Sequence, residues 1–178
     1  FLSQAAISAG CEGGVTDEEL CETSEIIFNR GEALVIKEKA ESLGSVVNIY
    51  EYVRNNYQYE SYFGVKSSSL NSFLAMEGND VDLATVLISM LRSVGVKSRY
   101  VTGTVRVQND DLVNWLKVES RPLATKILAL AGMDIDTSNS DYVDVAHVWV
   151  EALVDFENYR GVGEESCTSV SERCRWVA

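Results

Sequence analysis

The sequence predicts an α+β fold in which helices come first and pack on an antiparallel sheet. Residues 80–94 carry an apolar pattern of helical period, with Gly95 directly after it as the expected stop. Residues 98–107 and 143–154 alternate in polarity, as strands with one buried face do. Helices that precede strands, instead of alternating with them, are typical of the α+β class.

The earlier elements follow from spacing and capping signals. Two helices are expected within residues 33–57, where apolar residues recur every three or four positions. Ser45 can cap the second of them through its hydroxyl oxygen. A short helical patch follows at residues 69–76, and residues 111–131 predict one or two helices around Trp115.

The helix over residues 80–94 is the clearest element, and it is nearly buried because apolar residues also cover its flanks. Asp80 and Asp82 fall in its first turn, where carboxylates suit the positive end of the helix dipole.

With 178 residues, 46% of them hydrophobic, the chain is long enough for one buried core. We expect residues 1–44 to form a helical and looped extension with a local disulfide, and residues 45–178 to form the compact core. The first residue is Phe1 and no signal-peptide pattern follows, so the sequence is expected to be a piece of a longer or processed protein.

The net charge and the hydropathy pattern limit the classes of partner that the protein can bind. The net charge of −12 would repel phosphates, which disfavours nucleic acid and anionic membrane surfaces. No run of 18 apolar residues occurs, so no membrane-spanning segment is predicted. A cationic peptide remains electrostatically compatible.

The four cysteines form two local pairs along the sequence. Three connectivities are open, and we favour Cys11–Cys21 and Cys167–Cys174 because each closes a short polar loop. A zinc site is disfavoured by the single histidine and the lack of C-x-x-C spacing. Paired cysteines indicate an oxidising compartment, so an extracytoplasmic location is expected.

The acidic stretch 134–141 has part of the pattern of a calcium-binding loop. Asp134, Asp136 and Ser138 fit the first ligand spacings, but Asn139 replaces the expected glycine and Val145 the acidic twelfth residue. The pattern favours a solvated loop, and the sequence predicts no metal or cofactor.

The only histidine, His147, lies on the second predicted strand. Alternation places Trp149 and Glu151 on its face, with Val148 and Val150 on the other. A lone histidine is more often structural than catalytic, although an imidazole can act as acid or base near neutral pH.

Two segments together resemble the transglutaminase-like superfamily, whose fold is papain-related: GNDVDLATVLISMLRSVGVKSRYVTGTV at 78–105 and HVWVEA at 147–152. That family typically shows Gly-x-Cys-x-Asp-x-Ala at the start of a buried helix, then Leu-Leu-Arg…Gly…Ala-Arg-Tyr-Val-x-Gly, and later a His-x-Trp-x-Glu strand. The agreeing residues are Gly78, Asp82, Ala84, Leu91, Arg92, Gly95, Arg99, Tyr100, Val101, Gly103, His147, Trp149 and Glu151. The resemblance covers roughly residues 45–178 and looks closest to versions inside large bacterial secreted or surface proteins with repeats.

The sequence departs from the family at its nucleophile. Asp80 stands where the resemblance places the catalytic cysteine. A thiolate is a strong nucleophile at neutral pH, whereas a carboxylate attacks amides poorly and its anhydride would hydrolyse. The family also carries an aspartate on a strand that residues 173–178 are expected to begin, and the sequence stops before that aspartate would appear.

Two functions follow as hypotheses. The favoured one is a catalytically inactive module of a larger extracytoplasmic bacterial protein, whose cleft binds a peptide or a neighbouring domain. The alternative is an active hydrolase or acyl transferase with altered chemistry, in which Asp80 and His147 act as an acid–base pair on a water. In both, Asp80 and His147 are expected to meet at the base of a groove. The further binding residues expected there are Asn79, Asp82, Trp149 and Glu151.

Overall fold

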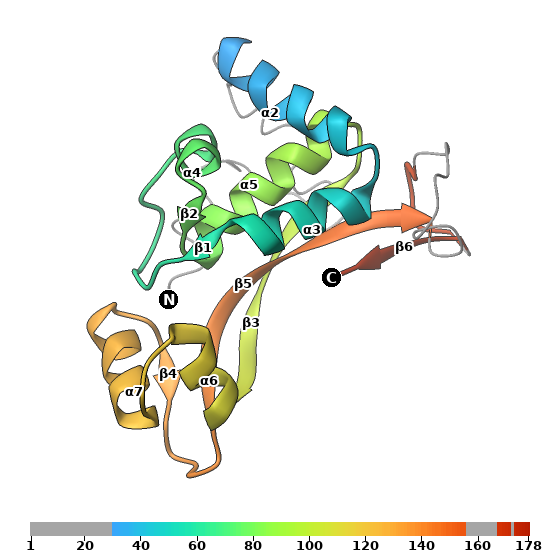
Figure 1. Ribbon diagram of the computed structural model, residues 1–178. Coiled ribbons are helices and arrows are strands. Elements are labelled where there is room, and N and C mark those ends of the chain that lie inside the picture. The colour runs from blue at the N-terminus through green and yellow to red at the C-terminus, as the bar shows by residue number, and fades with distance from the viewer. Residues whose placement is uncertain (1–29, 156–166, 172) are drawn as a thin grey trace, which may run out of the picture.

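The structure is a computed structural model that describes residues 30–155, 167–171 and 173–178. Within those residues the fold is α+β, as predicted, with helices packed on an antiparallel sheet (Figure 1). The helices are α2 (Arg30–Leu43), α3 (Val46–Asn56), α4 (Ser69–Ala75), α5 (Asp80–Ser93), α6 (Asn109–Leu116) and α7 (Arg121–Leu130). The strands are β1 (Gln58–Tyr59), β2 (Glu77–Gly78), β3 (Ser98–Gln108), β4 (Ile135–Asp136), β5 (Tyr142–Asp155) and β6 (Cys174–Val177).

Strand β5 is the centre of the main sheet. It pairs with β3 in an unbroken antiparallel register from Ser98↔Ala152 to Gln108↔Tyr142. Near its two ends it also pairs with β4 and with β6. Because β3 occupies one edge of β5 at both places, β4 and β6 must share the other edge. Between them, residues 146–151 of β5 have no strand partner on that edge within the described chain.

Local signals explain where the helices begin and end. The Ser45 side chain accepts a hydrogen bond from the Asn48 N–H at 3.1 Å and caps α3, as predicted. Helix α5 stops before Gly95, whose φ of +83° favours glycine. The predicted helical stretch 111–131 is two helices, divided after Lys117 in the left-handed conformation.

Two hydrophobic clusters lie on opposite faces of β5. The first joins α2, α3, α4 and α5 to the even-numbered residues Ala152 and Val154. The second joins α6 and α7 to the odd-numbered residues Val143 and Val145. Alternate residues of a strand face opposite sides, so helices cover one face at one end of β5 and the other face at the other end (Figure 1).

The predicted Cys167–Cys174 disulfide is present, with the two Cα atoms 5.7 Å apart. The predicted Cys11–Cys21 pair lies outside the described residues. None of the described helices has both the length and the apolar character that a bilayer crossing requires.

Candidate functional site

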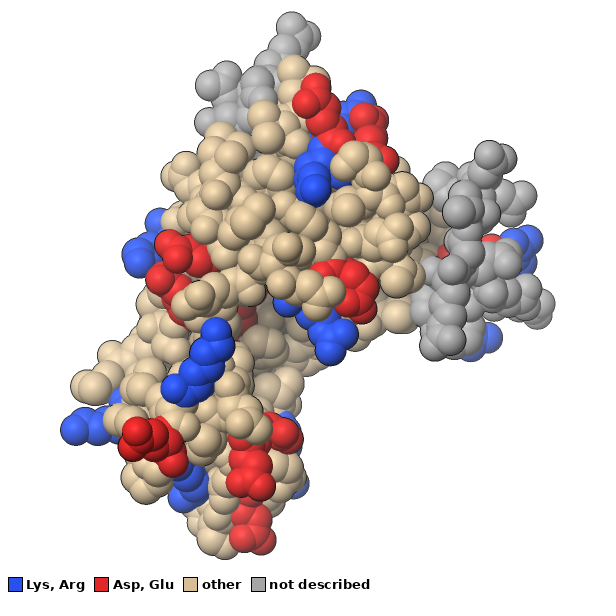
Figure 2. All heavy atoms as spheres, viewed as in Figure 1, with Lys and Arg blue, Asp and Glu red and all other residues tan. Residues whose placement is uncertain are grey.

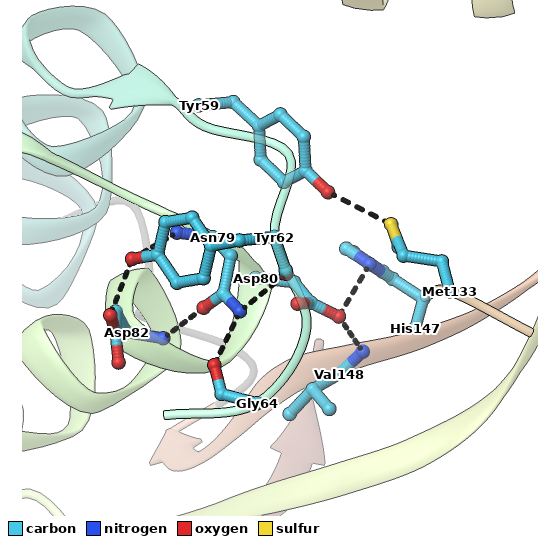
Figure 3. A network of polar contacts seen from close by, with 9 residues as sticks. All are labelled: Tyr59, Tyr62, Gly64, Asn79, Asp80, Asp82, Met133, His147 and Val148. Carbon is cyan, nitrogen blue, oxygen red and sulfur yellow. Dashed lines mark hydrogen bonds and ion pairs between the residues drawn. The ribbon is translucent and has the colours of Figure 1, made fainter. Parts of the chain in front are cut away.

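Asp80 and His147, distant in sequence, lie side by side where α5 begins beside the middle of β5 (Figure 3). Oδ2 of Asp80 is 3.2 Å from Nδ1 of His147. The same oxygen accepts a hydrogen bond from the backbone N–H of Val148 at 2.9 Å. The Asp80 side chain is only 9% exposed and that of His147 28% exposed, so the carboxylate lies beneath the imidazole.

The two contacts of the Asp80 carboxylate differ in kind. Nδ1 of His147 is buried and makes no well-aligned hydrogen bond, so its contact with Asp80 is electrostatic and is an ion pair when the imidazole is protonated. The Val148 N–H is an aligned donor, and it belongs to the stretch of β5 that has no strand partner on that edge. The carboxylate therefore supplies an acceptor that a neighbouring strand would otherwise provide.

A buried polar network fixes the first turn of α5. Asn79, the N-cap, accepts from the Asp82 N–H at 2.9 Å through Oδ1. Its Nδ2 donates to the carbonyl oxygens of Tyr62 at 2.9 Å and Gly64 at 2.7 Å. Tyr62 Oη donates to Asp82 Oδ2 at 2.5 Å and accepts from the Asn79 N–H at 3.1 Å. Asn79 and Asp82 are each 1% exposed, so both side chains fix the first turn of α5 from the interior of the protein.

Gly78 is required by this network. A Cβ at that position would lie 2.9 Å from Asp82 Cβ, closer than real Cβ atoms come. The glycine therefore lets β2 lie directly against the first turn of α5.

Two tyrosines near the site have raised pKa values. Burial raises the pKa of Tyr62 above its usual value near 10, and its hydrogen bond to Asp82 raises it further. Burial likewise raises the pKa of Tyr59, followed by the negative charge of Asp80. Both phenols therefore stay neutral at physiological pH. The sequence signal for them was only an aromatic-rich segment before α4, which did not single out either tyrosine.

Aromatic rings from other elements surround His147. The Trp115 ring of α6 meets the imidazole edge-on, with centroids 6.2 Å apart. Tyr59 packs on Trp115 at 4.7 Å and its hydroxyl contacts Met133 Sδ at 3.5 Å. Trp115, Tyr59 and Met133 thus form a wall beside the imidazole, which sequence reasoning did not assign to the site.

Trp149 and Glu151, expected to bind a ligand, make their described contacts along the sheet. The Trp149 ring covers Gly103 so closely that a Cβ there would lie 2.9 Å from Cη2. Glu151 pairs with Arg99 at 2.8 Å, and the Arg99 guanidinium stacks on Trp176. The position of the Trp149 ring explains why the strand pair needs glycine at position 103.

A separate apolar groove of about 320 Å³ lies between α3, α5 and the β5–β6 pair. It is lined mainly by Val46, Val47, Tyr50, Leu87, Val150 and Val177. Neither Asp80 nor His147 lines it. No group of three or more His, Cys, Asp or Glu side chains in the described part of the chain is arranged to hold a metal ion.

Within the described residues, the site places a carboxylate beside an imidazole, with no thiol or hydroxyl hydrogen-bonded to Nδ1 of His147. Both described cysteines are joined in the Cys167–Cys174 disulfide, so neither offers a thiolate. Among the described residues, no serine or threonine hydroxyl is hydrogen-bonded to Nδ1 of His147. Acyl transfer through a covalent intermediate requires such a group beside the base.

Comparison with known proteins gives one further finding. The family model described as the transglutaminase-like superfamily matches residues 32–178, which include α5, β3, β5 and β6. No curated protein and no solved structure matches the chain.

Proposed function

The chain belongs to the transglutaminase-like superfamily, and we propose that it is a non-catalytic member whose cleft binds a peptide or a neighbouring domain. In this proposal Asp80 occupies the position of the family's cysteine, since Gly78, Asp82 and Ala84 fit the surrounding motif. The parent would be a larger extracytoplasmic bacterial protein, with which the Cys167–Cys174 disulfide is compatible.

The observation that carries the proposal is the engagement of the Asp80 carboxylate. Its Oδ2 accepts from the Val148 N–H and lies 3.2 Å from His147, in a side chain that is 9% exposed. Attack on a substrate through Oδ2 would have to break these contacts and leave a backbone N–H unpaired, which costs about 1–3 kcal/mol for a buried group. The carboxylate is therefore suited to joining α5 to β5.

The surface above the pair supports binding. His147 is partly exposed, and Trp115 and Tyr59 add aromatic area that is only half-buried. Figure 2 shows that the outline of the molecule is hollowed where the part formed by α2–α5 meets the part formed by α6 and α7. Half-buried aromatic side chains favour an extended peptide, and the net charge of −12 favours one that is neutral or cationic.

Nuclear magnetic resonance with the ¹⁵N-labelled chain tests the binding site directly. Titration with pools of cationic and acidic octapeptides should shift the Trp115 indole and the 147–148 amides saturably, with the cationic pool binding more tightly. His147→Ala should weaken this binding, whereas Tyr50→Ala, in the separate groove, should leave it unchanged. Shifts confined to the groove residues Leu87 and Val150, or no saturable shifts, would contradict the proposed site.

The acid–base alternative draws on the same 3.2 Å contact. It requires Asp80 to exchange a proton with a water or substrate, so turnover that depends on its carboxylate distinguishes it from the binding module.

A further inference from the structure

The outer edge of β3 is unpaired by any strand in the described part of the chain, and β3 runs beside β5 from the region of α5 toward α6 (Figure 1). Its 11 residues keep one register with β5 and contain no bulge. Exposed edges of this length are usually protected by lysine, proline or a bulge, because they can pair with another chain. Residues 98–108 contain neither lysine nor proline.

The direction of the backbone groups on this edge follows from β5. The N–H groups of Ala146 and Val148 point away from β3, toward the Asp134 carbonyl and the Asp80 carboxylate. In an antiparallel ladder, two directly opposed residues either exchange both hydrogen bonds or both point outward. Their register partners Thr104 and Thr102 must therefore present N–H and C=O groups on the outer edge.

The charged side chains of β3 do not prevent its outer edge from pairing with another strand. Arg106 is bound to Asp144 by two hydrogen bonds of 2.9 Å and stacks on Tyr142. Arg99 is paired with Glu151 in the same way along the sheet. Both arginines are therefore paired with carboxylates of β5. At the start of the edge, Arg92 of α5 donates to the Ser98 carbonyl at 2.7 Å. A second strand is therefore best accommodated around Thr102 and Thr104, away from that charge.

The sequence of the edge is self-complementary. Residues 101–105 read Val-Thr-Gly-Thr-Val, a palindrome centred on Gly103. In an antiparallel pairing of two copies about Gly103, Thr102 of each copy lies opposite Thr104 of the other, and Val101 lies opposite Val105. The outward groups of Thr102 and Thr104 then face one another, as a hydrogen-bonded pair requires, and threonine pairs across strands are favourable.

We propose that two copies of this chain associate through β3, antiparallel about Gly103, to form one continuous sheet. The helices permit this arrangement. The two-fold axis is perpendicular to the sheet, so the same face of both copies lies on the same side of the joint sheet. Helix α5 packs on the face of the even-numbered residues near the start of β3, and α6 on the opposite face near its end. The α6 helix of one copy therefore faces away from the α5 helix of the other.

Sedimentation velocity of the full chain tests this over a concentration and salt series. Wild type should form dimers, and salt should strengthen them by screening the net charge of −12 that each copy carries. Thr102→Lys/Thr104→Lys places lysine opposite lysine on side chains that are exposed in the single chain. This double variant should raise the dimer dissociation constant by at least about tenfold.

A charge-matched control and a rescue make the test specific to β3. Thr137→Lys/Ser140→Lys adds the same charge on the exposed loop after β4 and should leave dimers intact. Thr102→Glu/Thr104→Glu should be monomeric alone and should form heterodimers with the lysine variant. A wild-type protein that is monomeric at every concentration and salt would overturn the proposal. A strand of another protein would then be the expected partner of the β3 edge. Lysine-variant dimers of unchanged affinity would overturn it by showing another interface.

Discussion

Asn79 shows, for one residue, how the start of α5 is held. Its side chain caps the helix through the Asp82 N–H and also donates to the carbonyl oxygens of Tyr62 and Gly64. The side chain of Ser45, the N-cap of α3, makes the capping contact alone within the described part of the chain. The two caps therefore differ in how much structure depends on them.

Asn79→Ala should accordingly cost more stability than Ser45→Ala. We expect about 1 kcal/mol for Ser45→Ala, a typical value for a lost cap. Asn79→Ala should cost about 2–3 kcal/mol, because two carbonyls also lose their donor. Urea denaturation of both variants measures the difference. Equal losses would show that the contacts to Tyr62 and Gly64 contribute nothing.

Tyr62 predicts a pH dependence at the alkaline end. Burial and its hydrogen bond to Asp82 raise its pKa above the usual value near 10, so the folded state favours the neutral phenol. The resulting stabilisation is complete below pH 10, the unfolded pKa, and is lost as pH rises through the folded one. In a phenolate absorbance titration, Tyr62→Phe should remove amplitude from the latest phase. If Tyr62→Phe instead removes absorbance amplitude near pH 10, the pKa of Tyr62 is not raised and the prediction is wrong.

For single residues, the sequence predicted only contacts between positions that are close together in the chain. Asn79 directly precedes a strongly periodic helix, and Asp80 and Asp82 fall in its first turn, as predicted. Tyr62 lies in an irregular segment, where no period connects it to Asp82. Its position depends on β1 and β2, two strands of two residues each, which leave almost no pattern in a sequence.

At the scale of elements, α5 and the α6–α7 pair are separately packed. Val86 and Met90 of α5 belong to one buried cluster, and Leu112 and Leu128 of α6 and α7 to the other. Helix α5 and the strands β3 and β5 were predictable because their periods persist over many residues. The sequence is compatible with one helix or two over residues 111–131, and the structure divides them through the left-handed Lys117, with Pro122 in the first turn of α7.

This separation predicts local unfolding in one part of the molecule. Leu128→Ala should create a cavity costing about 2–5 kcal/mol, since Leu128 is fully buried. Amide hydrogen exchange should then accelerate in α6 and α7 more than in α5. Met90→Ala, in the other cluster, should accelerate exchange in α5. Equal acceleration in both regions by both variants would show a single cooperative core.

At the scale of the whole molecule, the fold brings α5 and β5 together at Asp80 and His147. Polarity patterns define each element but do not say which elements meet, and the resemblance to a family supplied that relation. It matched the segment Asn114-Trp115 but gave Trp115 no role in the site, and Tyr59 lies outside the motifs it matched. Nor could it reveal that the Asp80 carboxylate accepts from a strand edge, since that contact depends on the gap between β4 and β6.

The Asp80 carboxylate joins α5 to β5, and we propose that it does no chemistry. Turnover of a panel of glutamine peptides, peptide amides, esters and glycans by wild type and Asp80→Asn tests it most directly. Asparagine keeps a side-chain oxygen for the Val148 N–H but cannot serve as a carboxylate base, so the variant should stay folded. We predict no turnover by wild type above the background of the uncatalysed reaction, and none by the variant. Turnover by wild type that Asp80→Asn abolishes would contradict the claim and establish the acid–base alternative.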